Sequence, residues 1–169
     1  RVLFLTKYYP PVEGGIERYS QLICQGLVEN GVVVDVVAAS ESGGNTFTEI
    51  SEGVTIHRLR NWGQFAGVPM SPSMPVVVRK LAEDCDLIHL NFPNPLADIT
   101  SISLTRWHPT VVTYHCDILR NRLLLRAYKP LVEMLLTRVS CIIATSDNYV
   151  RSSEFLRNRV ERCCVVPLP

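Results

Sequence analysis

The sequence predicts an α/β protein with one mostly parallel sheet and helices on both faces of that sheet. Short apolar runs alternate along the chain with longer segments whose apolar residues recur at helical spacing. One run, residues 32–39, is apolar almost throughout, as expected for a strand that is covered on both faces. The 169 residues are 47% hydrophobic and 20% charged, which fits one folded domain with a substantial core. Together these features indicate a doubly wound, Rossmann-like layer.

The alternation assigns each segment to a strand or a helix. No internal repeat, low-complexity tract or shift in composition divides the chain, so residues 1–169 are expected to form a single domain. We expect strands at residues 2–5, 32–39, 54–59, 86–91, 110–114, 141–144 and 162–166, and helices at residues 19–29, 76–84, 96–105, 120–138 and 147–157.

The turn after the first strand organises the chain. Pro10 and Pro11 lack the N–H groups that a strand needs, so the strand at 2–5 ends before them. Gly14 and Gly15 let the backbone approach another group closely, because neither residue has a Cβ atom. The first N–H groups of the following helix lack partners within the helix, and they suit a phosphate or a carboxylate. A plain tight turn is the alternative, since the sequence matches neither G-x-G-x-x-G nor the P-loop.

Glycine and proline mark the boundaries of later elements. Gly31 ends the first helix. Residues 61–75 carry three prolines and two glycines, which predicts a long loop, and loops of that length often carry function. Pro130 interrupts the helix at 120–138, so we expect a kink or two helices there. That segment has five basic residues and one acid, which indicates either a solvated face or a surface that contacts anionic lipid.

Charge and cysteine content exclude several classes of function. The net charge of +1 gives no electrostatic case for binding nucleic acid. No apolar run approaches the roughly 20 residues of a membrane span. The six cysteines include no C-x-x-C pair, which argues against zinc and thioredoxin-type chemistry. We therefore expect reduced thiols, no metal and a cytoplasmic location.

Polar clusters follow several of the predicted strands, at the edge where ligands bind in such sheets. His115 stands directly after the strand at 110–114 and is our candidate catalytic residue. Asp117 could orient His115, bind a sugar hydroxyl or cap the next helix. His89 lies inside its strand and is expected in the core or at an interface. The clusters at the carboxyl ends are Lys7-Tyr8-Tyr9 with Gly14-Gly15, Asn91-Phe92, His115-Cys116-Asp117 and Ser146-Asp147.

Taken together, these motifs resemble the N-terminal half of a GT-B glycosyltransferase, most closely the retaining enzymes of glycosyltransferase family 4. The run from Tyr8 to Arg18 and the run from Val112 to Asp117 are the specific matches. Weaker matches along the chain are Asp86-Leu87-Ile88-His89, Ile142-Ile143-Ala144-Thr145-Ser146 and Val165-Val166-Pro167-Leu168.

The resemblance implies roles for particular residues. Gly14 and Gly15 would lie against the donor diphosphate or the acceptor, and His115 would contact the transferred sugar or the acceptor near the reaction centre. Tyr9, Asn91 and Asp117 would contact the acceptor. The donor would be a nucleotide-sugar bound mainly by a second Rossmann domain, with retention at the anomeric carbon and with no metal or other cofactor.

The sequence also departs from the family pattern. The second domain, with its paired glutamates, is absent from these residues, and Val32 stands where the family often has histidine. We therefore expect an acceptor-binding domain that is inactive alone. The expected partners are a nucleotide-sugar, a glycan or lipid-linked acceptor and the missing C-terminal domain. The full enzyme is expected to add a hexose such as mannose to a lipid-linked or cell-surface glycan such as lipopolysaccharide, with peripheral contact to the inner face of the membrane.

Three other interpretations compete with this one. A dehydrogenase domain would need an acidic residue at the end of the second strand, where the sequence has Ala38-Ala39-Ser40. A non-catalytic module that binds sugar or phosphate would need no second domain. A structural domain without a ligand would leave His115 as a packing residue. Donor, acceptor and linkage would be set by the second domain and by the loop at 61–75.

Overall fold

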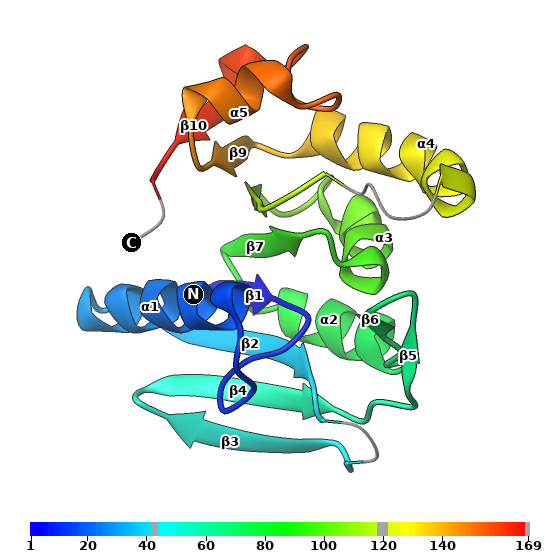
Figure 1. Cartoon of the computed structure of the whole chain (residues 1–169). Coiled ribbons are helices and arrows are strands. Elements are labelled where there is room, and N and C mark those ends of the chain that lie inside the picture. Colours follow the sequence, from blue (N-terminus) through cyan, green and yellow to red (C-terminus); the bar gives the residue numbers. More distant parts are fainter. Residues whose placement is uncertain (42–43, 118–121, 168–169) are drawn as a thin grey trace.

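The sheet joins both halves of the chain into one layer. The computed structural model describes residues 1–41, 44–117 and 122–167. Within them, an 8-stranded sheet has the order β10-β9-β8-β7-β1-β2-β4-β3 (Figure 1). Every neighbouring pair is parallel except β3 with β4. The predicted α/β class and mostly parallel sheet are thus confirmed.

The elements follow the predicted alternation closely. The strands are β1 (Val2–Leu5), β2 (Val34–Ala39), β3 (Phe47–Ser51), β4 (Val54–Leu59), β5 (Gln64–Phe65), β6 (Val68–Pro69), β7 (Leu87–Phe92), β8 (Thr110–Tyr114), β9 (Cys141–Ala144) and β10 (Cys163–Val165). The helices are α1 (Gly15–Glu29), α2 (Met74–Ala82), α3 (Pro95–Leu104), α4 (Arg122–Arg138) and α5 (Asp147–Ser152), and a 3-10 turn spans Val160–Arg162.

Strand β3 was missing from the sequence prediction. It pairs antiparallel with β4 through a two-residue turn in which Glu52 has φ 50° and Gly53 has φ 79°. Positive φ at both positions is the geometry of a type I′ hairpin turn, which suits the right-handed twist of paired strands. The side chains of β3 are mostly exposed, with Ile50 at 75%, so the strand has no apolar run to reveal it.

The loop predicted at 61–75 contains regular structure. β5 and β6 pair as a small hairpin, and two backbone hydrogen bonds close its base, from Trp62 N to Met70 O at 2.9 Å and from Met70 N to Gly63 O at 2.8 Å. Helix α2 starts at Met74 rather than at residue 76. Pro75 lies in its first turn, where a proline removes no hydrogen bond of the helix.

Two later helices also differ from expectation. Pro130 lies inside one continuous helix α4, so of the two predicted alternatives the pair of helices was wrong and the kink stays a prediction. The residues just before α4 fall outside the described ranges. Helix α5 ends at Ser152 rather than at residue 157, because Ser153 adopts an extended backbone.

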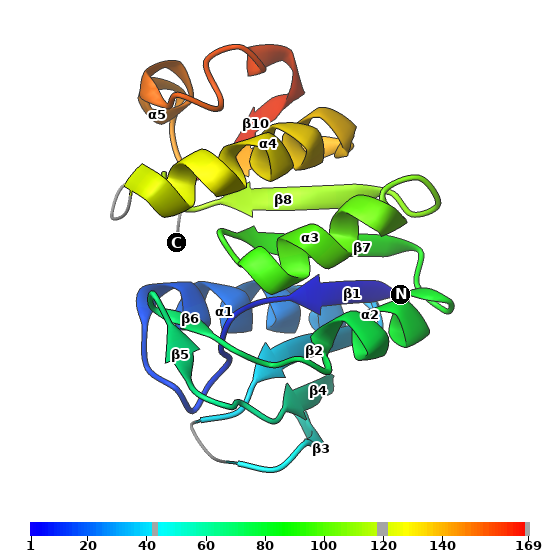
Figure 2. The same cartoon turned by 90° about the vertical axis from the view of Figure 1, so that its right-hand side faces the viewer.

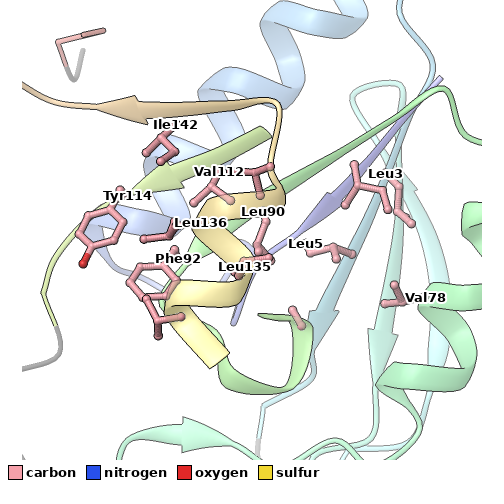
Figure 3. Close-up of a cluster of buried hydrophobic side chains, with 14 of the residues drawn as sticks. Leu3, Leu5, Val78, Leu90, Phe92, Val112, Tyr114, Leu135, Leu136 and Ile142 are labelled. Carbon is pink, nitrogen blue, oxygen red and sulfur yellow. The ribbon is translucent and has the colours of Figure 1, made fainter. Parts of the chain in front are cut away.

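The two faces of the sheet have different cores. Among the described helices, α1 covers the face of Phe4, Val36 and Ile56, whereas α2, α3, α4 and α5 cover the opposite face (Figure 2). Figure 3 shows that larger cluster, which includes Leu3, Leu5, Val78, Leu90, Phe92, Val112, Tyr114, Leu135, Leu136 and Ile142. Helices therefore cover both faces, as predicted.

The strand order places a topological switch point at the centre of the sheet. β1 pairs with β2 on one side and with β7 on the other. In sheets of this kind, the connections on the two sides leave a crevice beyond the carboxyl ends of the central strands. The segments that emerge there are the turn that leads from β1 into α1, the end of β7 and the end of β8 (Figure 2).

Candidate functional site

The double-glycine turn and His115 lie at the same edge of the sheet. The Tyr19 ring, in the second turn of α1, contacts the His115 ring edge-on, with centroids 5.1 Å apart and an interplanar angle of 82°. His115 follows β8 directly and is half-buried. Because α1 begins at Gly15, this contact joins the start of that helix to the end of β8. The predicted convergence of the two motifs on one rim is therefore observed.

Asn91 stands at the centre of a buried polar network beneath this rim. It lies near the carboxyl end of β7 and is 2% exposed. Its Oδ1 atom lies 3.1 Å from Nε2 of His115. Its Nδ2 atom donates to Ser20 Oγ at 2.7 Å and to Thr6 Oγ1 at 3.3 Å. Three chain segments thus meet at one amide group.

His115 is held in its neutral form at ordinary pH. Burial and the positive charge of Lys7 lower the pKa of His115 to about 4. A neutral imidazole carries one N–H donor and one lone-pair acceptor, and both suit the hydroxyl groups of a saccharide. The chemistry available to His115 is therefore hydrogen bonding rather than charge.

A second histidine lies one layer deeper. His89 Nε2 lies 2.8 Å from Thr113 Oγ1, and the same hydroxyl lies 3.1 Å from the hydroxyl of Tyr19. Burial and the neighbouring His115 lower the pKa of His89 to about 4. His89 is 6% exposed, which confirms the predicted core position. Its contacts connect β7 and β8 to α1 beneath the rim.

The loop before Gly14 is held by side chains from distant parts of the chain. Arg58 of β4 is 5% exposed and donates to the carbonyl oxygens of Tyr9 and Pro10. Gln64 of the β5–β6 hairpin donates to the hydroxyl of Tyr8 at 2.8 Å. These contacts fix the path of the chain between β1 and α1.

The two glycines have different surroundings. A Cβ atom at Gly14 would collide with the side-chain carboxylate of Glu17, which folds back over the start of α1. A Cβ atom at Gly15 would meet nothing within 4 Å. A carboxylate at the amino end of a helix is favourable for the helix dipole. Glu17 therefore occupies the kind of position that an anionic ligand would use.

Asp117 joins the end of β8 to the segment after α5. Its Oδ1 atom accepts hydrogen bonds from the hydroxyl of Tyr114 at 2.7 Å and from Ser153 Oγ at 2.8 Å. The alternative in which Asp117 caps the next helix concerns residues 118–121, which lie outside the described ranges. A contact between Asp117 and an acceptor stays a prediction.

Two of the predicted acceptor contacts are buried. Tyr9 is 4% exposed and packs with Cys24 and Val36 in the core beneath α1. Asn91 has its amide oxygen and nitrogen engaged within the network. Their burial favours a supporting role for both residues over direct contact with a ligand.

The sequence reasoning did not single out several residues of the network. Thr6 directly follows β1 and Thr113 lies near the end of β8, and a polar side chain at such a place is the signal that marks the rim. Tyr19 and Ser20 were read only as part of a helix. Arg58 carried no local signal, because its partners are far away in the sequence.

On the opposite face of the sheet, α3 carries a buried carboxyl group. Asp98 Oδ2 accepts hydrogen bonds from the Asn94 backbone at 3.0 Å and from the hydroxyl of Tyr128. Burial raises the pKa of Asp98 to about 7, although Tyr128, Asn94 and Lys7 act in the other direction. This group ties the start of α3 to α4.

The basic residues in the described part of helix α4 differ in their partners. Lys129 forms an ion pair with Glu154 at 2.5 Å, and Arg138 donates to the carbonyl oxygen of Ile102 at 3.3 Å. Arg126 is exposed. The lipid contact considered for this helix stays a prediction.

A cavity of about 270 Å³ lies away from the rim, beside the carboxyl end of α4. Two of its lining residues, Arg159 and Glu133, form an ion pair with each other. Within the described ranges, no three His, Cys, Asp or Glu side chains gather as a metal site would require. None of the helices described combines the length and apolar character needed to cross a membrane.

The fold and the rim define a class of protein. A doubly wound sheet with a glycine turn, an open helix start and a neutral histidine at its switch point is suited to bind a phosphorylated or hydroxylated ligand. The family model of Glycosyltransferase Family 4 matches residues 13–168. The chain belongs to this family.

Individual relatives agree with the family match. The chain is 34% identical to O-antigen chain mannosyltransferase C of Escherichia coli over 99% of its own length and 45% of the relative's. It is 34% identical to D-rhamnosyltransferase WbpZ of Pseudomonas aeruginosa over 98% of its length and 44% of the relative's. The chain thus spans less than half the length of these curated relatives.

A solved structure supports the fold. The sucrose-phosphate synthase of Thermosynechococcus elongatus superposes with a TM-score of 0.73 at 15% identity, covering 98% of this chain and 47% of that one. At this identity, the likeness concerns the arrangement of the elements alone. This arrangement agrees with the predicted Rossmann-like domain of a GT-B fold.

Proposed function

We propose that this chain is the acceptor-binding half of a retaining glycosyltransferase. The full enzyme transfers a hexose such as mannose from a nucleotide-sugar to a lipid-linked or cell-surface glycan such as lipopolysaccharide. The observation that carries the proposal is the contact of His115 with the first turns of α1 at the switch point of the sheet. The relatives, an O-antigen mannosyltransferase and a rhamnosyltransferase, support the class of acceptor.

In this proposal, the start of α1 provides the electrostatic part of catalysis. Negative charge develops on the leaving phosphate as the glycosidic bond to the donor breaks. The open N–H groups that follow Gly14 and Gly15 and the charge of Lys7 would stabilise that oxyanion. Glu17 would turn away when the phosphate arrives, since both groups prefer the same end of the helix. The missing domain would supply most of the nucleotide site.

His115 would contact the transferred sugar or the acceptor. Its neutral ring can bond hydroxyl groups without attracting the diphosphate, so it would orient the saccharide rather than bind the leaving group. Asp117 at the same edge would contact the acceptor, while Tyr9 and Asn91 support the site from below.

The test uses the full-length protein with a panel of labelled nucleotide-sugars and a lipid-linked oligosaccharide. We expect transfer from one donor, with the anomeric configuration retained in the product by NMR and with full rate in EDTA. His115→Gln should lower kcat/KM by roughly a hundredfold, since a group at the reacting sugar acts in the transition state. His108→Gln, with its imidazole at the opposite edge of the sheet, is the matched control.

Three results would contradict the proposal. Sugar or phosphate binding without transfer from any donor would favour a non-catalytic binding module. Transfer that inverts the anomeric configuration would refute the retaining mechanism. Transfer at full rate by the 169 residues alone would refute the division of labour between the two domains.

A further inference from the structure

The hydroxyl group of Ser20 has a defined direction. Ser20 lies in the second turn of α1, is 0% exposed and donates its hydrogen to the carbonyl oxygen of Ile16 at 2.7 Å. A serine hydroxyl has only one hydrogen to donate. In its 2.7 Å contact with the amide of Asn91, the Ser20 oxygen can therefore only accept a hydrogen bond.

This direction determines how the amide of Asn91 is placed. The amide nitrogen faces Ser20, because the serine hydrogen is directed at Ile16 and the 2.7 Å contact therefore offers an acceptor and no donor. Thr6 Oγ1, at 3.3 Å from Nδ2, lies on the same side of the amide. The amide oxygen is consequently left to face His115, at 3.1 Å from Nε2. The reversed amide would place its oxygen 2.7 Å from the oxygen of Ser20 and leave it only the longer contact with the Thr6 hydroxyl, which costs free energy in a buried site.

The amide oxygen of Asn91 in turn requires a hydrogen on His115. An oxygen acceptor at hydrogen-bond distance needs an N–H donor, so the ring carries its proton on Nε2. The lone pair of the neutral ring is then on Nδ1. A chain of hydrogen bonds thus runs in one direction from His115 through Asn91 and Ser20 to the backbone of α1.

We propose that Asn91 is a positioning residue that holds His115 as its Nε2–H tautomer, so that Nδ1 accepts a hydrogen bond from a hydroxyl group of the bound saccharide. The inference rests on the proposed function for the identity of the ligand and on the network for the tautomer. Asn91 acts through His115 and touches no substrate. The same network links the tautomer to the helix that begins at the double-glycine turn.

The tautomer can be measured without any substrate. The full-length protein is labelled with ¹⁵N at histidine, and the ring nitrogens of His115 are assigned with His115→Gln. We expect the shift of a protonated nitrogen at Nε2 and of an unprotonated nitrogen at Nδ1. A proton on Nδ1, or an equal mixture of tautomers, would overturn the proposal.

One variant and its control test the direction of the hydrogen-bond chain. Ser20→Ala removes the acceptor that orients Asn91, so both tautomers of His115 should become populated and kcat/KM should fall about tenfold, the effect of one lost hydrogen bond. Ser101→Ala is the matched control, because Ser101 is an equally buried helical serine on the opposite face of the sheet. If Ser20→Ala leaves the tautomer as in Ser101→Ala, the positioning role is refuted.

Asn91→Asp gives an independent readout. A carboxylate beside Nε2 favours the imidazolium form, so the pKa of His115 should rise by roughly one to three units. The other groups that act on this ring, Lys7, His89 and Tyr19, are unchanged in the variant. The acid limb of the kcat/KM profile should move up by the same interval. An unmoved pKa of His115 would contradict the proposal.

The NMR measurements and the transfer assay together separate the inference from the proposed function. If the NMR results are as expected and transfer is unaffected by Ser20→Ala and Asn91→Asp, then the saccharide role of His115 is wrong and the tautomer assignment stands. If transfer is lost while the tautomer is unchanged, then the positioning role is wrong.

Discussion

The Nη1 atom of the buried Arg58 donates a hydrogen bond to the carbonyl oxygen of Tyr9 at 3.1 Å. The same guanidinium donates to the carbonyl oxygen of Pro10 and, through Nε, pairs with Glu49 at 2.6 Å. An arginine of β4 thereby shapes the loop that leads into the double-glycine turn. The rim of the candidate site depends on this contact from outside its own sequence neighbourhood.

Arg58→Met should loosen this loop and destabilise the protein. The substitution leaves the buried carbonyl oxygen of Tyr9 and the partly buried one of Pro10 without this donor, which should lower the free energy of unfolding by about 2–4 kcal/mol. Urea denaturation measures the loss, and amide exchange over residues 12–18 should accelerate. Arg60→Met, at an exposed position two residues further along the chain, should be near neutral. Equal stability of the two variants would show that the Arg58 contacts are unimportant.

His89 should make the protein sensitive to acid. The pKa of His89 is about 4 in the folded protein, whereas an ordinary histidine has a pKa of 6.5. The unfolded chain therefore binds more protons than the folded protein between these two pH values. Stability is therefore complete above pH 6.5 and falls as the pH drops toward 4, by up to about 3 kcal/mol. His89→Gln should flatten this dependence in denaturation measured between pH 4 and 8, and His108→Gln should not. His115 contributes in the same direction, so some dependence should persist.

Asp98 should give the protein a pH dependence of stability opposite to that of His89. The pKa of Asp98 is about 7 in the folded protein, whereas an ordinary aspartate has a pKa of 3.8. The folded protein therefore binds more protons than the unfolded chain between these two pH values. Its contribution to stability falls as the pH rises from 4 to 7. Asp98→Asn should therefore gain stability relative to the wild type between pH 4 and pH 8, on the order of 1–4 kcal/mol. A constant difference between the two proteins would refute the buried, protonated carboxyl group.

Tyr128→Phe provides a second measure of the same group. Removing the hydroxyl that donates to Asp98 should raise the pKa of the carboxyl group further, because hydrogen bonding to the charged form is lost. The pH window of Asp98 should then move upward in the same denaturation series.

Two glycines with similar backbone angles should respond differently to alanine. Gly53 has φ +79° and a Cβ there would approach Val28 Cγ1 of α1 at 2.7 Å, whereas Gly67 has φ +78° and nothing within 4 Å. Gly67→Ala should cost about 1 kcal/mol for the backbone alone. Gly53→Ala should cost more, about 2–3 kcal/mol, because packing of β4 against α1 is disturbed as well. Thermal unfolding of both variants tests the difference, and equal losses would exclude a role for the Val28 contact.

The sequence predicted the buried strands because their signal is local. Residues 32–39 and 141–144 are apolar runs, and apolar runs appear in the sequence whatever the strand packs against. Strand β3 escaped notice because Phe47 and Ile50 face solvent, and only the turn at Glu52 and Gly53 marks it. The strand prediction thus worked where burial and strand formation coincide.

The helix predicted at 147–157 shows how tertiary contacts override periodicity. Val150, Phe155 and Leu156 are all buried, which gave the segment its helical pattern. Ser153, however, is extended and donates to Asp117, so the helix ends before it. A hydrogen bond to a distant residue decided the boundary.

For the candidate site, the sequence indicated the edge and its principal side chains. His115 was predicted because it stands directly beyond a strand that the pattern located, and Gly14 and Gly15 because they lie in the turn between the first strand and the first helix. The burial of Tyr9 and Asn91 could not be predicted, since it depends on how α1 packs over the sheet. Partners such as Ser20 with Asn91 become visible only in three dimensions.

The hairpin of β5 and β6 closes on itself at its base, where Trp62 and Met70 are joined by backbone hydrogen bonds. Its strands belong to a separate two-stranded unit and share no pairing with the main layer. Protein engineers can therefore treat residues 63–69 as an exchangeable cassette, swapping in arms of other lengths while the eight-stranded scaffold keeps its register. Such grafts should retain Gln64, whose amide anchors the arm to Tyr8.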